Sequence, residues 1–314
     1  MPTLRQLEYL VAVADTRHFR RAAERVSATQ PTLSEQLQVM EARLGVQLIE
    51  RSRSNVLLTP IGLEVLEIGR RMLRDAQHIR DITGSIGRGL AGVIRLGLPS
   101  TIGPYLLPRV VPHLHALHPQ LKLYVREELP HALPRGLIDG LHDIIIAPLP
   151  VEEAGLCQTI IFQEPLYLAV PIDHVLAQRE RIEACDLADL ELLALGPGHQ
   201  LRDLVCGLAT EVGAKVRFDY EGTSLDTLRE MMATGLGVTI LPGLYVQTVL
   251  SKDARFKTFT IGGLELSRTI GMFWSKTRAG QKSFERLAAL FREAAGSDFK
   301  ALAAVPWRNG LLSA

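Results

Sequence analysis

Hydrophobic positions in the first 45 residues recur at helical spacing in three segments, residues 4–16, 19–26 and 30–44. Between the second and third segments lies a short polar stretch. In it Thr29 can cap the following helix, and Pro31 fits the first helical turn, where a missing N–H costs nothing. Two short helices joined by such a turn, under a first covering helix, form a helix-turn-helix. An ordinary helical hairpin with a solvated outer face has the same pattern, so the pattern alone leaves both structures open.

The start of the third segment presents short polar groups on the side opposite its apolar face. Side chains of this kind are suited to reading base edges in the major groove of DNA. The outward residues are Gln30, Pro31, Thr32, Ser34 and Glu35. Residues 49–59 then have the pattern of a small wing that carries Arg51 and Arg53 beside the duplex. Together with Arg20 and Arg21, these arginines are expected to contact phosphate or the minor groove.

A long helix is predicted from residue 60 to about residue 88, with apolar residues on a seven-residue repeat. One row is Val65, Met72, Ile79 and Ile86, and the other is Ile61, Ile68 and Ile82. We interpret these rows as a dimer seam. Packing of the helix on its own domain is the alternative, because Asp75 interrupts the second row. A dimer formed through this helix would space two recognition helices by one DNA turn or a multiple of it, so the expected operator is an inverted repeat.

From residue 93 onward, short β-type runs alternate with helical stretches, which indicates an α/β domain with parallel sheets covered by helices. The runs are residues 93–98, 122–127, 143–148, 166–170, 191–195, 216–220, 238–241 and 270–274. The predicted organisation is a DNA-binding domain at 1–59, a linker helix and glycine-rich hinge at 60–92, the α/β domain at 93–295 and a C-terminal tail at 296–314.

Composition restricts the class of protein further. A chain of 314 residues with 47% hydrophobic and 22% charged residues can form two or three packed domains and is not typical of disorder. No segment approaches the roughly 18 uninterrupted apolar residues of a membrane helix. Glu8 and Asp15 lie where a signal peptide is uncharged, so the expected location is the cytoplasm, with no membrane partner. The three cysteines have no C-x-x-C spacing, and neither a disulfide framework nor a zinc site is predicted.

Charge is distributed unevenly along the chain. Residues 1–92 contain 13 Arg and no Lys against 10 Asp plus Glu, which gives +3 there and −2 in the remainder. This bias is weak for a DNA-binding protein. Affinity is therefore expected to depend on doubling the module in a dimer and on a few placed arginines.

Candidate ligand groups lie in three segments that follow predicted strands and open predicted helices, residues 99–104, 196–200 and 221–224. Open α/β sheets bind ligands outside the carboxyl ends of their strands, so we expect these segments to converge on one cleft. Their hydroxyl residues are Ser100, Thr101, Thr223 and Ser224. Each of these hydroxyls taken alone is better explained by a helix cap, and their convergence on one cleft is what favours a ligand site.

The ordered run Ala22-Ala23, Ser-x-Thr-Gln-Pro-Thr-Leu-Ser (27–34), Leu-Gly-Val (44–46), Glu-Arg (50–51) and Leu-Thr-Pro-x-Gly (58–62) resembles the N-terminal module of LysR-type transcriptional regulators. The resemblance implies a winged helix-turn-helix, a long linker helix and a two-lobed α/β effector domain similar to periplasmic binding proteins. The first lobe would comprise about 93–163 and 267–295, and the second about 164–266.

Three later motifs resemble the peroxide-sensing members of that family: Gly103-Pro-Tyr-Leu-Leu-Pro, Gly198-His-x-Leu-Arg-Asp and Thr223-Ser-Leu-x-Thr-Leu-Arg. In those members a peroxidatic cysteine directly follows the histidine of the second motif, and a resolving cysteine lies nine residues later. This chain has Gln200 and Ala209 there, and an amide cannot form a sulfenic acid. The resemblance also implies that Thr101 and His199 lie at the effector, with Pro130 in place of a second threonine.

The predicted function is a DNA-binding LysR-type regulator whose operator binding and promoter activation change when a small effector occupies the cleft. It would act as a homodimer or homotetramer, with RNA polymerase as a further expected partner and with no cofactor. One alternative is an oxidative-stress regulator that uses Cys206 alone, because Arg202 lies one helical turn away and favours the thiolate. An inert, half-buried thiol is the competing interpretation of Cys206.

An α/β enzyme is the alternative from another class. It is disfavoured because the sequence has no G-x-S-x-G elbow, paired His and Cys motif or cofactor loop. No metal is expected either. His113, His115 and His118 are interpreted as exposed helix residues, because no carboxylate or cysteine nearby completes a ligand set.

Overall fold

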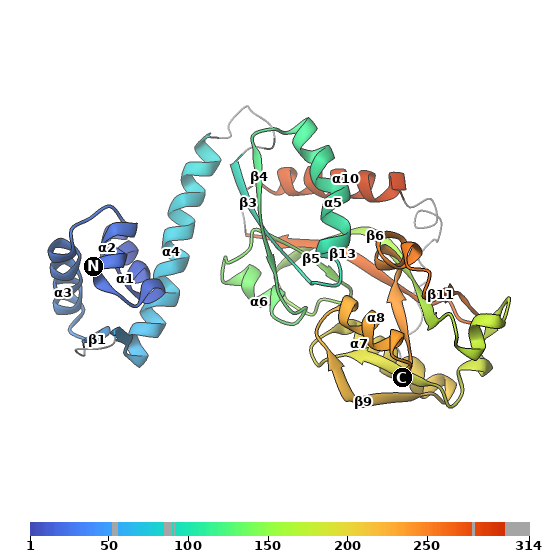
Figure 1. Ribbon diagram of the computed structural model, residues 1–314. Coiled ribbons are helices and arrows are strands. Elements are labelled where there is room, and N and C mark those ends of the chain that lie inside the picture. Colours follow the sequence, from blue (N-terminus) through green and yellow to red (C-terminus); the bar gives the residue numbers. More distant parts are fainter. Residues whose placement is uncertain (52–55, 85–89, 91, 278–279, 299–314) are drawn as a thin grey trace. The chain divides into compact units, whose positions relative to one another are not determined.

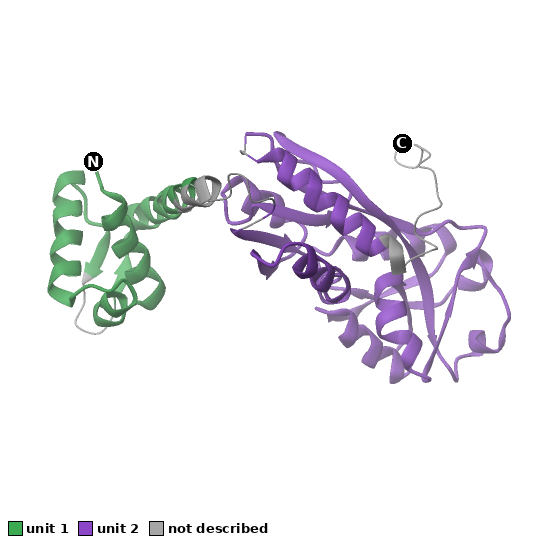
Figure 2. Cartoon of the chain, turned by 90° about the horizontal axis from the view of Figure 1, so that it is seen from above, with its two compact units in different colours: residues 1–86 green, residues 87–314 purple. Residues whose placement is uncertain are grey.

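The computed structural model describes residues 1–51, 56–84, 90, 92–277 and 280–298. The chain forms two compact units, Met1–Ile86 and Gly87–Ala314, which are coloured separately in Figure 2. Over the described residues, no helix combines the length and the apolar content needed to cross a membrane.

The first unit is the predicted winged helix-turn-helix followed by the long helix (Figure 1). Its elements are α1 (Leu4–Thr16), α2 (Phe19–Arg25), α3 (Gln30–Leu44), β1 (Ile49–Arg51), β2 (Val56–Leu58) and α4 (Pro60–Gly84). The side chain of Thr29 caps α3 by accepting a hydrogen bond from the Thr32 amide at 3.3 Å, as expected. The core lies where the apolar faces of the helices meet, with Leu10, Leu33 and Met40 fully buried.

The start of α4 is fixed to the wing by the Leu-Thr-Pro-x-Gly motif. The Thr59 hydroxyl accepts a hydrogen bond from the Gly62 amide at 3.0 Å and donates one to the Gln47 carbonyl at 2.8 Å. A Cβ on Gly62 would lie 2.1 Å from the carbonyl oxygen of Leu48, so only glycine allows this approach. The last residues of the predicted helix, 85–88, lie outside the described residues.

The second unit is built on a nine-stranded sheet with helices packed against it (Figure 1). Its first lobe contains β3 (Gly92–Leu98), α5 (Gly103–Leu117), β4 (Leu121–Glu127), α6 (Leu133–Ile138), β5 (Ile144–Pro148), β13 (Ser267–Ser275) and α10 (Gln281–Asp298). Its second lobe contains β8 (Glu191–Leu195), α7 (Gln200–Val212), β9 (Lys215–Gly222), α8 (Leu225–Ala233), β10 (Val238–Pro242), α9 (Gly243–Thr248) and β11 (Phe256–Phe259). Short elements complete the second lobe: η1 (Val175–Gln178), β7 (Ile182–Glu183), η2 (Ala184–Leu187), η3 (Leu250–Lys252) and β12 (Ile261–Gly262).

A single long strand, β6 (Leu156–Pro171), belongs to both lobes. Up to Pro165 it pairs with β13, and from Leu166 it pairs with β10 and β11. All these pairings are antiparallel, as is that of β5 with β13. The predicted parallel pairing occurs between β3 and its neighbours β4 and β5, and between β8 and its neighbours β9 and β10, so the sheet is mixed. The chain leaves the first lobe along β6 and returns along β13, and two neighbouring strands that run out and back must be antiparallel.

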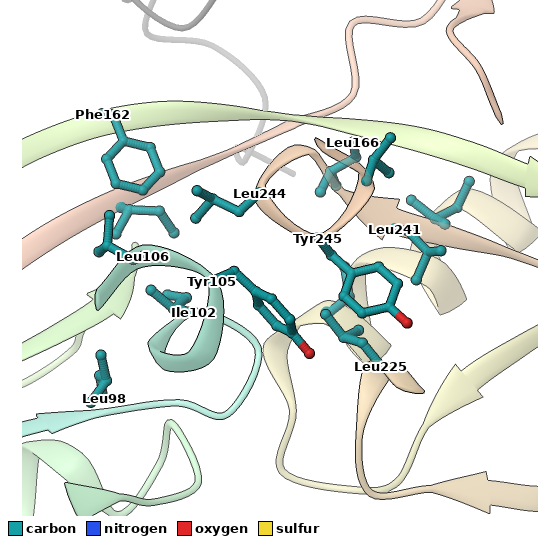
Figure 3. Close-up of a cluster of buried hydrophobic side chains, with 14 of the residues drawn as sticks. Leu98, Ile102, Tyr105, Leu106, Phe162, Leu166, Leu225, Leu241, Leu244 and Tyr245 are labelled. Carbon is teal, nitrogen blue, oxygen red and sulfur yellow. The ribbon is translucent and has the colours of Figure 1, made fainter. Parts of the chain in front are cut away.

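The core of the second unit continues from one lobe into the other. Figure 3 shows Tyr105 of α5 and Tyr245 of α9 within this cluster, among buried leucines from both lobes. The two rings pack edge to face, with centroids 5.1 Å apart and planes at 88°. The Tyr245 hydroxyl also donates to Asp226 at 3.0 Å.

Candidate DNA-binding surface and effector cleft

The start of α3 exposes the residues predicted to read DNA. Leu33 and Leu37 are buried, which turns Gln30, Thr32 and Glu35 to solvent. Pro31 is also exposed, and Ser34 is half-buried. The surface is held in place from behind. The Gln6 side chain of α1 donates to Gln36, and Glu41 of α3 accepts hydrogen bonds from the Leu48 and Ile49 amides at the wing.

The predicted arginines differ in their surroundings. Arg20 and Arg21 are both exposed, and Arg20 forms an ion pair with Glu24 at 3.3 Å. Arg51 ends β1, but its side chain and the whole of Arg53 lie outside the described residues. The structure therefore places Arg20 and Arg21 on α2, next to the helix proposed to enter the groove.

Apolar residues line one side of α4 and remain exposed within the first unit. Ile61, Ile68, Met72 and Ile79 are 41–63% exposed. Val65 of the predicted seam is instead half-buried and packs on the core of the first unit. The side chain of Ile82 and all of Ile86 lie outside the described residues.

The second unit contains a cleft with a volume of about 460 Å³. All three segments that the sequence predicted to converge contribute to its walls. The lining residues are Ser100, Glu127, Glu128, Leu129, Gly196, Pro197, His199, Glu221, Gly222 and Thr223. A cleft of this size suits a small organic molecule.

His199 is the most enclosed ionisable group of the cleft wall. The residue is 6% exposed, and its Nδ1 is buried without a hydrogen-bond partner among the described residues. Burial, and then the charge of nearby His131, lower the pKa of His199 below its ordinary value of 6.5, so the imidazole is neutral at pH 7. Gly198, at φ 87°, lets His131 approach, because a Cβ there would lie 2.9 Å from its ring.

Four other predicted effector residues are not among the lining residues. Ser224 caps α8 by accepting from the Thr227 amide at 3.2 Å, and Pro130 is half-buried. Gln200, at the peroxidatic position, donates its side-chain amide to the Leu149 carbonyl at 2.8 Å and so links the second lobe to the first. Thr101 is 3% exposed.

A buried ion pair holds Thr101. Arg268 of β13 donates to Glu164 of β6 at 2.7 Å, and both side chains are at most 2% exposed. The remaining guanidinium nitrogens donate to the Thr101 hydroxyl at 3.2 Å and to its carbonyl at 3.0 Å. Glu164 also accepts from the Leu244 amide at 2.8 Å. The pair is thus satisfied on both sides, as a buried pair must be.

Sequence reasoning missed the carboxylates Glu127 and Glu128. They lie at the carboxyl end of β4, the same kind of position that identified the other three segments, so extending that rule to β4 would have found them. Glu128 is held by two partners. The His142 Nε2 lies 3.1 Å from the Glu128 carboxylate, and the Arg126 guanidinium lies 2.7 Å from it. The His142 ring lies between Gly97 and Gly136, where a Cβ on either glycine would come within 2.8 Å of it.

The remaining candidates are separate from the cleft lining. Cys206 on α7 is half-buried. His115 is exposed as expected, but His113 and His118 are half-buried and the Nε2 of His113 is enclosed, which corrects the expectation that all three are exposed. Within the described ranges, no cluster of three His, Cys, Asp or Glu side chains could hold a metal ion.

The chain belongs to the LysR family. The model of the bacterial regulatory helix-turn-helix protein, lysR family, matches residues 4–63, and that of the LysR substrate binding domain matches residues 87–296. A DNA-binding module joined to an effector-binding domain defines a LysR-type transcriptional regulator.

Within that family the chain is closely related to OxyR. It is 39% identical over 289 residues to the DNA-binding transcriptional dual regulator OxyR of Escherichia coli K12, an alignment that covers 92% of this chain and 94% of that protein. It is also 39% identical to the hydrogen peroxide-inducible genes activator of Pectobacterium carotovorum, over 92% of this chain and 96% of that protein. Among solved structures, a full-length OxyR variant from Pseudomonas aeruginosa superposes with a TM-score of 0.71 at 36% identity, covering 93% of this chain and 98% of that chain.

Proposed function

We propose that this regulator responds to a small molecule bound in the cleft of its second unit and does not use a thiol–disulfide switch. The observation that carries the proposal is the state of Gln200. Its amide is engaged with Leu149, and it stands where the peroxide-sensing relatives are expected to have their reactive cysteine. The position nine residues later, where those relatives are expected to have the resolving cysteine, is occupied by Ala209, an apolar residue that is 3% exposed. The lining hydroxyls of Ser100 and Thr223 and the imidazole of His199 provide directional hydrogen bonds for an effector.

On DNA, the residues proposed to contact base edges are Gln30, Pro31, Thr32, Ser34 and Glu35. The arginines proposed to contact phosphate or the minor groove are Arg20, Arg21, Arg51 and Arg53. Two copies would pair along the exposed apolar side of α4, as a homodimer or a homotetramer, and bind an inverted-repeat operator. The exposed Ile61, Ile68 and Met72 support this pairing, because apolar groups gathered on one helix side favour burial against a partner. RNA polymerase is the further partner proposed at the promoter. The proposed function includes no enzymatic activity, since the related proteins are transcription regulators.

Effector binding would act by changing the relative populations of lobe arrangements, which in turn respaces the DNA-binding modules of the oligomer. The lobes taken as moving parts are about 93–163 with 267–295, and about 164–266.

A second candidate is redox sensing through Cys206 alone, which the names of the relatives and the partial exposure of this thiol favour. The deciding experiment measures operator binding and promoter output with and without hydrogen peroxide, for the wild-type protein and for Cys206→Ser. The proposal expects no peroxide response in either protein. A response present in the wild type and lost in Cys206→Ser would replace the proposal with the redox mechanism.

A further inference from the structure

The charged side chains that line the cleft are acidic. Its lining includes three carboxylates, Glu127, Glu128 and Glu221, and no lining residue within the described chain is Lys or Arg. Carboxylates gathered in a concave, partly apolar site focus a negative potential and raise the local concentration of cations.

Ion pairs inside the protein neutralise only part of this charge. Glu128 pairs with Arg126 at 2.7 Å, and Glu221 pairs with Arg202 at 2.9 Å. Glu127 forms no ion pair with any described residue. Its Oε1 lies 3.1 Å from the position of a Cβ on Gly103, at the first turn of α5, where the helix dipole favours a negative group. One negative charge of the cleft is therefore left for a ligand.

A second, independent feature also indicates a polar ligand. His199 is buried to more than nine-tenths in the cleft wall, yet its Nδ1 has no partner among the described residues. Buried polar atoms are normally hydrogen-bonded, so an imidazole in this state is suited to a contact that a ligand completes. A neutral imidazole next to carboxylates accommodates a cation without repulsion.

The helix starts around the cleft do not favour an anion instead. The first turn of α8 is capped by Ser224 and contains Asp226, and the first turn of α7 contains Asp203. These acidic groups already balance the positive ends of both helix dipoles. Metal ions are disfavoured for a different reason, since within the described residues no three ligating side chains converge.

We propose that the effector of this regulator is a small organic ammonium compound whose ammonium group is held by Glu127 and donates hydrogen bonds to the lining hydroxyls and to the His199 imidazole. This assignment rests on the proposed role of the cleft as the effector site. A cavity of about 460 Å³ holds a linear diamine or a compact amino compound with room for bridging water.

The test uses the full-length protein and three four-carbon probes that differ in charge: 1,4-diaminobutane, 1,4-butanediol and succinate. Isothermal titration at pH 7.5 is expected to detect binding of the diamine and of neither other probe. Glu127→Gln is expected to weaken diamine binding about tenfold, the usual effect of one charge-assisted contact. Glu180→Gln makes the same charge change at an exposed position outside the cleft lining, and it is expected to bind the diamine as the wild type does.

Several results would overturn the assignment. Binding of succinate or butanediol in preference to the diamine, or equal weakening by both Glu→Gln changes, would show that the lining carboxylates do not select a cation. Tight binding of Mg²⁺ at the same residues would replace the organic ligand with a metal. Operator binding is measured in parallel, both without a probe and with each of the three probes. If succinate or butanediol alters operator binding and the diamine does not, the cleft keeps its proposed sensing function but its effector is not an ammonium compound.

Discussion

The glycine at position 62 provides a sharp test of how α4 is joined to the DNA-binding module. In Gly62→Ala the new Cβ would lie 2.1 Å from the Leu48 carbonyl oxygen and 3.1 Å from the Thr59 hydroxyl. Contacts of a Cβ below 3.0 Å are essentially never seen, so the methyl group must retreat by at least about 0.9 Å. The obstacle is backbone, which cannot rotate away as a side chain would. The first turn of α4 must move and stretch the hydrogen bonds that Thr59 makes to both segments.

The expected cost combines overpacking, about 1–3 kcal/mol, with partial loss of the Thr59 cap, about 1 kcal/mol. For a unit of this size, a loss of about 2–4 kcal/mol lowers the Tm by at least about 8 °C. Calorimetry of the full-length protein, with operator binding as a second readout, measures the effect. The control is Gly207→Ala on α7, where a Cβ meets nothing within 4 Å and alanine should stabilise the helix by up to about 1 kcal/mol. Equal effects of the two substitutions, or a neutral Gly62→Ala, would refute the steric argument.

Other predictions follow from the second unit and from α2. Arg268→Met is expected to destabilise by about 3–5 kcal/mol because it leaves Glu164 charged and buried, while the double change to Met at both positions should recover much of that loss in urea unfolding. The lowered pKa of His199 means that its contribution to stability is fully present above about pH 6.5 and is lost as pH falls through the lowered value. The wild type should therefore lose more stability between pH 7.5 and 5.5 than His199→Phe does, and parallel losses would contradict this. Arg21→Ala should weaken operator binding for all sequences and reduce the slope of log K against log salt by about 1, whereas the exposed Arg135→Ala of α6 should leave that slope unchanged.

Local sequence patterns predicted most of the secondary structure of this protein. All three helices of the DNA-binding module and the eight β-type runs of the second unit occur where helical and alternating periodicity placed them. The patterns failed where geometry depends on distant residues. β6 was predicted only for residues 166–170, because its first half contains Gln158, Gln163 and Glu164 in place of a continuous apolar run. Its antiparallel partners lie about 100 residues later in the chain.

The candidate site divides in the same way. The convergence of three loops could be predicted, because the carboxyl ends of parallel strands share one edge of a sheet. The role of Thr101 could not be predicted, since the arginine that engages it is 167 residues away. Gln200 is a similar case. Sequence shows that a thiol is missing there, but only the structure shows that the amide reaches across to Leu149.

The continuous course of β6 determines how motion can pass through the second unit. Its hydrogen bonds change from β13 to β10 between Pro165 and Leu166, while both flanks remain bonded into a sheet. Each lobe therefore keeps its own strand pairings, and the change of partner occupies a residue or two beside the buried carboxylate of Glu164. If the two lobes rotated about this point, a small rotation would become a much larger displacement at their outer ends. An effector that closed the cleft by a fraction of its width would then move the far edges of the unit, and substitutions beside Glu164 would alter the size of the response more than the affinity for the effector.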